Sequence, residues 1–315
     1  MALTSGTMLS LPEPSSEDAF VRVSPFDTAV MRCPQHLIIK DAPGDYICGS
    51  WRFFISHAPS KTKLWFDLGV SHDLSVYAQP LHDFQIKLFN TIPAPNSVLD
   101  DMEKLQEDPK DVKYVILSHA HWDHVFPVKD QLPNATFICG AGTLNIMKDH
   151  GYWPKNKESE YDERIWNPKH SELPIKELPP SPTASASFPQ TDKWGKLGTF
   201  EKALDFFGDG SFYLIDTPGH LAGNISALCR ARTQKGETRW ILLAGDCFHS
   251  HHFVGLPDTP FGTISLVPSG CIHVDPETAR DTIRRISALR ESDPRVRVWA
   301  AHAGLLEGYW EFPKQ

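Results

Sequence analysis

One short stretch of the chain decides its fold, and it reads Tyr114-Val115-Ile116-Leu117-Ser118-His119-Ala120-His121-Trp122-Asp123-His124. The first four residues are apolar or aromatic, a pattern typical of a buried strand. The residues that follow place three imidazoles and a carboxylate just where that strand ends. Imidazole and carboxylate are the usual protein ligands of zinc and related divalent metals. The stretch therefore predicts a metal site at the edge of a sheet, rather than a polar loop that happens to contain histidines.

Three later segments repeat this arrangement, since each is an apolar, strand-like run that ends in a ligand residue. Taken alone, a histidine in such a place is more often a turn or core residue. Because four successive strand ends all carry residues that bind metals, we interpret them as parts of one metal centre. The later ligand residues are His220 after a Pro-Gly turn, Asp246 after a glycine, and His302.

The order of these residues resembles the metallo-β-lactamase superfamily. The pattern is His-x-His-x-Asp-His, then a histidine after Pro-Gly, then Gly-Asp, then a late histidine, and Asp67-Leu68-Gly69 looks like an acidic turn that many members carry. The resemblance implies an α/β fold, the αββα sandwich in which helices flank two mixed β-sheets. It also implies two divalent metal ions at one edge, zinc above all, with iron or manganese as alternatives. The first ion would be held by His119, His121 and His220, and the second by Asp123, His124 and His302, with Asp246 bridging both.

Elementary chemistry gives each of these groups a use. Three imidazoles leave one tetrahedral position on the first metal open for water, as a catalytic zinc site requires. A second metal can share that water and lower its pKa toward neutrality. Asp246 would reduce the repulsion between the two cations, and Asp123 could also orient the hydroxide as a catalytic residue. The chain has no Cys-x-x-Cys pair of the kind that structural zinc sites use, which favours a catalytic site.

Composition sets the broad class of protein. At 315 residues and 41% hydrophobic, the chain can form a single domain over residues 1–315. We expect an N-terminal arm at 1–30 and a Pro/Trp-rich insertion at 151–197. The insertion could be a solvated loop, a lid over the metal edge or a subunit contact.

Charge and cysteine usage narrow the partners and the compartment. A net charge of −8 argues against nucleic-acid binding, and no apolar run is long enough for a membrane helix. The N-terminus also lacks the order of a signal peptide. The six scattered cysteines are expected to be reduced and buried. We therefore expect a cytoplasmic protein that acts on a small molecule, with a homodimer as an open alternative.

Three residues near the ligand motifs are expected to face the substrate. In the related lactone-hydrolysing enzymes, a tyrosine three residues beyond the bridging aspartate contacts the substrate carbonyl oxygen, and here that position is His249. An imidazole could polarise a carbonyl or protonate a leaving group near neutral pH. We assign His249 a catalytic and substrate-binding role, with a surface histidine as the alternative. Trp122 and Phe248 are expected to line the cleft, unless they belong to the core.

These features predict a dinuclear metallo-hydrolase of the lactonase or lactamase type. Similarity to lactone hydrolases and to fungal γ-lactamase and polyketide thioesterase-like members implies that a metal-bridging hydroxide opens a cyclic ester or amide. An aromatic-fused xenobiotic such as a benzoxazolinone is one such substrate. Three alternatives stay open. They are a thioester hydrolase of the acyl-carrier-protein or glyoxalase II type, a mononuclear iron persulfide dioxygenase, and a metal-stabilised binding module without activity.

Overall fold

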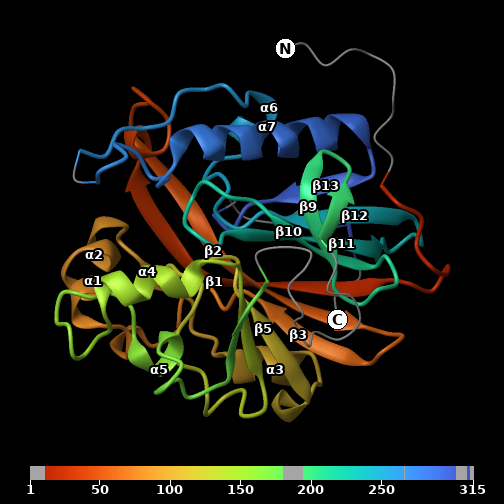
Figure 1. Ribbon diagram of the computed structural model, residues 1–315, viewed down its shortest axis with the longest axis horizontal. Coiled ribbons are helices and arrows are strands. Elements are labelled where there is room, and N and C mark those ends of the chain that lie inside the picture. Colours follow the sequence, from red (N-terminus) through yellow and green to blue (C-terminus); the bar gives the residue numbers. More distant parts are fainter. Residues whose placement is uncertain (1–10, 180–193, 266, 303–310, 313–315) are drawn as a thin grey trace.

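A computed structural model describes residues 11–179, 194–265, 267–302 and 311–312, and it shows a sandwich of four layers (Figure 1). The first sheet has seven strands in the order β4-β1-β2-β3-β5-β6-β7. The second has six in the order β13-β12-β11-β10-β9-β8. Helices α1 to α5 cover the outer face of the first sheet, and α6 and α7 cover that of the second. The αββα sandwich predicted from the sequence is confirmed.

The elements have the following bounds. The first sheet contains β1 (Val21–Pro34), β2 (Asp45–His57), β3 (Thr62–Phe66), β4 (Ile92–Pro93), β5 (Val112–Ile116), β6 (Thr136–Cys139) and β7 (Ile175–Glu177). The second contains β8 (Trp194–Leu197), β9 (Phe200–Asp205), β10 (Phe212–Asp216), β11 (Ile225–Arg232), β12 (Thr238–Leu243) and β13 (Val296–Trp299). The helices are α1 (Gln79–Asp83), α2 (Gln85–Leu88), α3 (Val98–Lys104), α4 (Thr143–His150), α5 (Glu163–Trp166), α6 (His252–Gly255) and α7 (Pro276–Ser292), with 3₁₀ turns at Gln35–Leu37, Leu74–Val76 and Pro109–Asp111.

Both faces of each sheet are buried, because successive residues of a strand pack into different layers. In β2, Phe54 packs toward α1 to α5, whereas its neighbour Ile55 packs between the two sheets. In β12, Leu242 packs against the α7 side and Leu243 faces the first sheet. The central strands therefore read as continuous apolar runs rather than as alternating ones.

The predicted arm at residues 1–30 is wrong for its last ten residues. β1 begins at Val21 and pairs with β2 along its whole length. Val21 and Val23 are buried between the sheets. Pro25 lies inside this strand, and proline is uncommon in strands because it has no backbone N–H to donate. The strand is therefore difficult to recognise from the sequence. Residues 1–10 lie outside the described residues.

The insertion at 151–197 is in large part packed structure. Residues 153–166 fold back on themselves, with Trp153 donating its backbone N–H to Tyr161, and Trp166 of α5 is buried in the core. β7 extends the first sheet beside β6. The described part, 151–179 and 194–197, is therefore not a solvated loop, and 180–193 lie outside the described residues. Nowhere in the described ranges is a helix both long and apolar enough to cross a membrane.

Candidate metal centre

The predicted ligand residues meet at one edge of the sandwich because of how the strands run. β11 is antiparallel to both β10 and β12, and β13 is parallel to β12. The carboxyl ends of β10, β12 and β13 therefore lie at the same edge. These ends lead directly to His220, Asp246 and His302. The loop after β5, which carries residues 117–124, reaches the same edge from the first sheet: Ile225 at the start of β11 donates its N–H to the carbonyl of Ser118.

One group of side chains forms around His121. Its Nδ1 lies 2.9 Å from Nε2 of His119 and 3.0 Å from Nε2 of His220. Oδ2 of Asp246 lies 3.7 Å from Nε2 of His119 and 3.5 Å from Nε2 of His220. All four ligand atoms lie within 4.8 Å of one another. Three nitrogen atoms and an oxygen at this spacing can bind one cation.

A second group shares Asp246 with the first. Nε2 of His302 is 3.3 Å from Oδ2 of Asp123, and Nε2 of His124 is 3.9 Å from its Oδ1. Oδ1 of Asp246 lies 3.3 Å from Nε2 of His124, and its Oδ2 lies 3.3 Å from Nε2 of His302. The structure thus brings the seven predicted ligand residues together, with the carboxylate of Asp246 between the two groups.

Buried atoms without a well-formed hydrogen bond indicate that these residues fit metal ions. Nε2 of His124 and Oδ1 of Asp246 are buried and lie 3.3 Å from each other, but neither makes a hydrogen bond of normal geometry among the described residues. Buried polar atoms almost always find a partner, because leaving them without one is unfavourable. Both atoms point into the ligand groups, where a divalent cation would satisfy them.

The protonation states of the ligands also suit a metal. Burial, reinforced by neighbouring imidazoles, holds the pKa of His119 and His220 well below the ordinary value, so both are neutral donors. Burial alone would raise the pKa of Asp246, but His302 and His124 outweigh it and keep the carboxyl group ionised. Burial likewise opposes a charge on His124, yet Asp246 and Asp67 raise its pKa to about 10. A metal that binds His124 must therefore displace a proton.

Outer residues hold the ligand rings in place. Oδ2 of Asp67 lies 2.8 Å from Nδ1 of His124, and Asp67 accepts from the backbone N–H and the hydroxyl of Ser118. The same hydroxyl lies 3.0 Å from Nδ1 of His119. Nδ1 of His302 lies 3.1 Å from the carbonyl oxygen of Gly49. Such contacts orient a ligand ring and leave its other nitrogen for the metal. The acidic turn noted in the sequence thus supports the centre from behind.

His273 is the residue of this site that the sequence does not reveal. Its Nδ1 lies 3.3 Å from Nδ1 of His220, and its ring is buried. Burial lowers the pKa of His273 to about 3, so the ring is neutral. The contact arises because the backbone N–H groups of Val274 and Asp275 donate to the carbonyls of His220 and Gly219. No motif in the sequence signals this pairing.

His249 lies inside the centre, so the surface alternative is wrong. Its side chain is buried, and its Nε2 is 3.1 Å from Oδ2 of Asp246. The ring stacks on that of His302, with centroids 5.3 Å apart and planes 11° from parallel. Nδ1 of His249 has no hydrogen-bond partner in the described part of the chain. The residue can therefore reach either a cation or a substrate.

Trp122 and Phe248 are both buried, as the core alternative for these residues expects. Trp122 is buried and packs edge-on against Tyr77, with ring centroids 5.3 Å apart. Phe248 is fully buried in the layer between the second sheet and α7. Each aromatic ring follows or precedes a ligand residue, and neighbouring side chains point in different directions. Cys247 is likewise turned from the ligands, since its sulfur lies near the hydroxyl of Ser226.

The family model described as the metallo-beta-lactamase superfamily matches residues 92–302. The chain is 28% identical over 305 residues to the metallo-hydrolase mfmC of Annulohypoxylon moriforme, and the match covers 83% of this chain and 72% of mfmC. It is 32% identical over 222 residues to the gamma-lactamase FDB1 of Fusarium pseudograminearum, covering 67% of this chain and 48% of FDB1. The match therefore spans about half the length of that gamma-lactamase.

Solved structures share the fold. A quorum-quenching N-acyl homoserine lactone lactonase superposes with a TM-score of 0.61 at 15% identity, covering 93% of this chain and 97% of the lactonase. AidC, a dizinc quorum-quenching lactonase, superposes with a TM-score of 0.54 at 12% identity, covering 97% of each chain. At these identities the likeness is one of architecture.

Proposed function

This chain belongs to the metallo-beta-lactamase superfamily, and from that premise we propose that it is a dinuclear metal-dependent hydrolase that opens a cyclic ester or amide. The observation that carries the proposal is the position of Asp246, whose two carboxylate oxygens contact histidines of both ligand groups. A single cation in the first group would need only one oxygen of Asp246, whereas the other oxygen lies 3.3 Å from Nε2 of His124 in the second group. A binding module without activity would not need a complete ligand set.

The ligand residues form two sets, one for each cation, and we propose that both cations are zinc. His119, His121 and His220 would hold one cation, and Asp123, His124 and His302 the other, with Asp246 between them. When bound, such metals act as Lewis acids toward a carbonyl oxygen and lower the pKa of water.

The protein itself contributes positioning and proton transfer. Asp123 is hydrogen-bonded through Oδ2 to His302, and its other oxygen faces His124, so it can orient a water molecule between the two ligand groups. Nε2 of His249 faces the carboxylate of Asp246, and Nδ1 has no hydrogen-bond partner among the described residues. With both ring nitrogens protonated, Nδ1–H can donate to a carbonyl oxygen or protonate a leaving oxygen or nitrogen. The buried surroundings exclude bulk water and strengthen these interactions.

The relatives support a lactone or γ-lactam as the substrate. FDB1 is named as a gamma-lactamase, and the structural neighbours include lactonases. Among such substrates, we propose an aromatic-fused γ-lactam such as a benzoxazolinone as the specific candidate. The six cysteines are all buried and free of disulfides. Cysteines without disulfides suit a reducing compartment, and we propose that this compartment is the cytoplasm.

A substrate panel tests this function directly. Purified protein loaded with zinc is offered lactones, γ-lactams including a benzoxazolinone, and thioesters, and the hydrolysis products are followed by liquid chromatography. We expect hydrolysis of a lactone or lactam that disappears with a chelator and returns with zinc. Turnover of thioesters alone would favour the thioesterase alternative. Full activity in metal-free protein would refute the proposal.

A further inference from the structure

A histidine that binds a metal usually has a hydrogen-bond partner for the ring nitrogen that faces away from the metal. Nδ1 of His124 has the carboxylate of Asp67, and Nδ1 of His302 has a backbone carbonyl oxygen. Nδ1 of His220 has a different kind of partner. It lies 3.3 Å from Nδ1 of His273, which is its only hydrogen-bond partner among the described residues.

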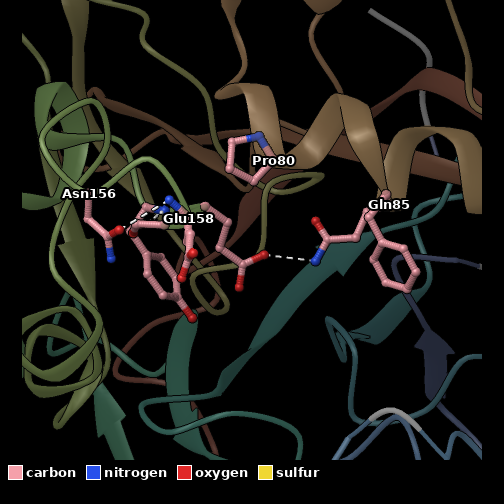
Figure 2. A pocket seen from close by; sticks show the side chains of 8 residues that line it. Pro80, Gln85, Asn156 and Glu158 are labelled. Atoms are coloured by element: carbon pink, nitrogen blue, oxygen red, sulfur yellow. Dashed lines mark hydrogen bonds between the residues drawn. The ribbon is translucent and has the colours of Figure 1, made fainter.

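The cavity between α1, α2 and the folded part of the insertion does not reach His220. This cavity has a volume of about 350 Å³, and a hydrogen bond of 2.8 Å from Nε2 of Gln85 to Oε2 of Glu160 joins two of its lining residues (Figure 2). None of the lining residues belongs to either ligand group. The partner of His220 therefore comes from the segment before α7, and not from the insertion.

The backbone holds His273 against His220. The N–H groups of Val274 and Asp275 donate to the carbonyl oxygens of His220 and Gly219, at 3.0 and 2.9 Å. Gly219 lies so close to α7 that a Cβ atom there would be 2.2 Å from a backbone nitrogen of that helix, and its φ of 125° also favours glycine. The turn that carries His220 and the segment that carries His273 therefore form one unit.

The ring of His273 is held as well. It is buried, and it packs on Phe261 with ring centroids 4.6 Å apart. The guanidinium carbon of Arg280 lies 3.7 Å from the centroid of the same Phe261 ring. Sγ of Cys271 lies 3.4 Å from the backbone nitrogen of His273. These contacts fix the ring whose Nδ1 faces His220.

The direction of this hydrogen bond follows from the other ring nitrogen of His220. Its Nε2 lies 3.0 Å from Nδ1 of His121 and 3.5 Å from Oδ2 of Asp246, within the first ligand group. In a neutral imidazole one nitrogen carries the proton and the other has a free lone pair. Because Nε2 of His220 must keep its lone pair to bind a cation, the proton is on Nδ1. Nδ1 of His273 is then the acceptor.

We propose that His273 is a positioning residue of the metal centre: its Nδ1 accepts a hydrogen bond from Nδ1–H of His220 and thereby keeps Nε2 of His220 available to the first cation. This inference rests on the proposed metal centre and adds a residue to it. If His273 only filled the core, an apolar ring of similar size could replace it. If its acceptor atom matters, such a ring leaves a buried N–H of His220 unpaired, which is unfavourable.

Two substitutions separate these roles because they predict opposite orders of zinc affinity. His273→Phe keeps a ring and removes the acceptor, whereas His273→Asn is smaller but can place an amide oxygen near the position of Nδ1. Zinc affinity is measured by competition with a chromophoric chelator in the His302→Ala background, in which only the first ligand group is complete. We expect affinity to fall by about tenfold or more in His273→Phe, and by less than about threefold in His273→Asn. Unchanged affinity in His273→Phe, or weaker binding by His273→Asn than by His273→Phe, would overturn the proposal.

The His220→Ala background tests whether His273 acts through His220. The zinc ion that remains in the second group should bind equally well with and without His273→Phe, since the partner of His273 is gone. Equal losses in the two backgrounds would overturn the proposal, because they would show a general effect on the fold.

The matched control is His57→Phe. His57 is also buried and stacks on a phenylalanine, Phe207, with ring centroids 3.9 Å apart. It ends β2, which is antiparallel to β3, and β3 leads to Asp67 beside the metal centre, so His57 lies at the opposite edge of the sheet. We expect His57→Phe to leave zinc affinity unchanged. A loss as large as that in His273→Phe would contradict a specific role for His273.

A spectrum of the zinc-loaded wild type tests the hydrogen bond without any substitution in the centre. Histidine-selective ¹⁵N NMR distinguishes a ring nitrogen that carries a proton from one that does not. We expect His220 to carry its proton on Nδ1 and His273 to carry its proton on Nε2. A proton on Nδ1 of His273 would overturn this inference alone, even if His273→Phe failed to fold. The expected tautomers and zinc affinities in a protein that hydrolyses no lactone or lactam would refute only the proposed function.

Discussion

Nε2 of His249 lies 3.1 Å from Oδ2 of Asp246, the carboxylate oxygen that also approaches His119, His220 and His302. His249 is therefore placed against the one group that both halves of the metal centre share. Its ring plane is held by stacking on His302. This position allows two roles, that of a proton donor to the substrate and that of an extra ligand, and they can be separated.

The His249→Ala variant should keep its metals and lose kcat by about 100-fold, because a positioned acid or hydrogen-bond donor is missing. KM should change little. His249→Gln, which retains a donor, should recover part of the loss. The checks are steady-state kinetics and metal content by elemental analysis. Wild-type kcat in His249→Ala would retire the residue as a catalytic group, and a loss of one metal would make it a ligand.

Asp67 should control metal affinity without touching the metal. Its backbone has φ of 55°, a conformation that asparagine tolerates well and alanine does not. Asp67→Asn therefore isolates the lost charge beside His124, and we expect metal affinity to fall by about 10- to 100-fold. Competition with a chromophoric chelator measures it. Wild-type affinity in this variant would show that the contact with His124 does not matter for binding.

The buried pair of Arg52 and Asp101 should be the most sensitive polar contact of the fold. Nη2 of Arg52 lies 2.6 Å from Oδ2 of Asp101, and both side chains are almost fully inaccessible. Arg52→Met leaves the buried carboxylate of Asp101 with only the half-exposed Lys104 at its other oxygen, so the free energy of unfolding should fall by about 3 kcal/mol. The matched control is Arg32→Met, which loses an exposed pair with Asp45 and should cost under about 1 kcal/mol. Urea denaturation of both variants gives the comparison, and equal losses would contradict it.

Acid stability should depend on Asp209. Burial would raise its pKa, but hydrogen bonds from Ser211 and His57 outweigh this and hold the pKa below the ordinary 3.8. The folded state therefore gains stability from this carboxylate above pH 3.8, and loses it as the pH falls through the lower folded value. Between pH 5 and 3, wild type should lose more stability than Asp209→Asn. Urea midpoints across this range test it, with the exposed Asp130→Asn as control. Parallel curves for wild type and Asp209→Asn would contradict the assignment.

The sequence was informative where chemistry and local structure coincide. The ligands could be predicted because each follows an apolar strand, and strand ends at one sheet edge converge. The sandwich followed from the family resemblance that the order of these ligands carries. The start of β1 was not predicted because Pro25 lies within the strand. In the folded protein the strand is held by its antiparallel pairing with β2, which no local sequence pattern records.

Other features depend on long-range packing that no local pattern records. His273 is 53 residues from His220 and meets it through two backbone hydrogen bonds formed only in the folded protein. Trp122 and Phe248 are apolar, and an apolar residue suits a core as well as a cleft. Their positions were decided by the direction of neighbouring side chains in tight turns, which composition does not encode.

The stoichiometry of metal binding tests the central claim most directly. Metal-free protein is titrated with zinc by calorimetry and the bound metal is counted by elemental analysis, in wild type and in two variants. We expect two ions per chain in wild type and about one in both His220→Ala and His302→Ala, since each removes a ligand from a different group. Binding of at most one ion by wild type, or of two by both variants, would contradict a centre built from two ligand groups around Asp246.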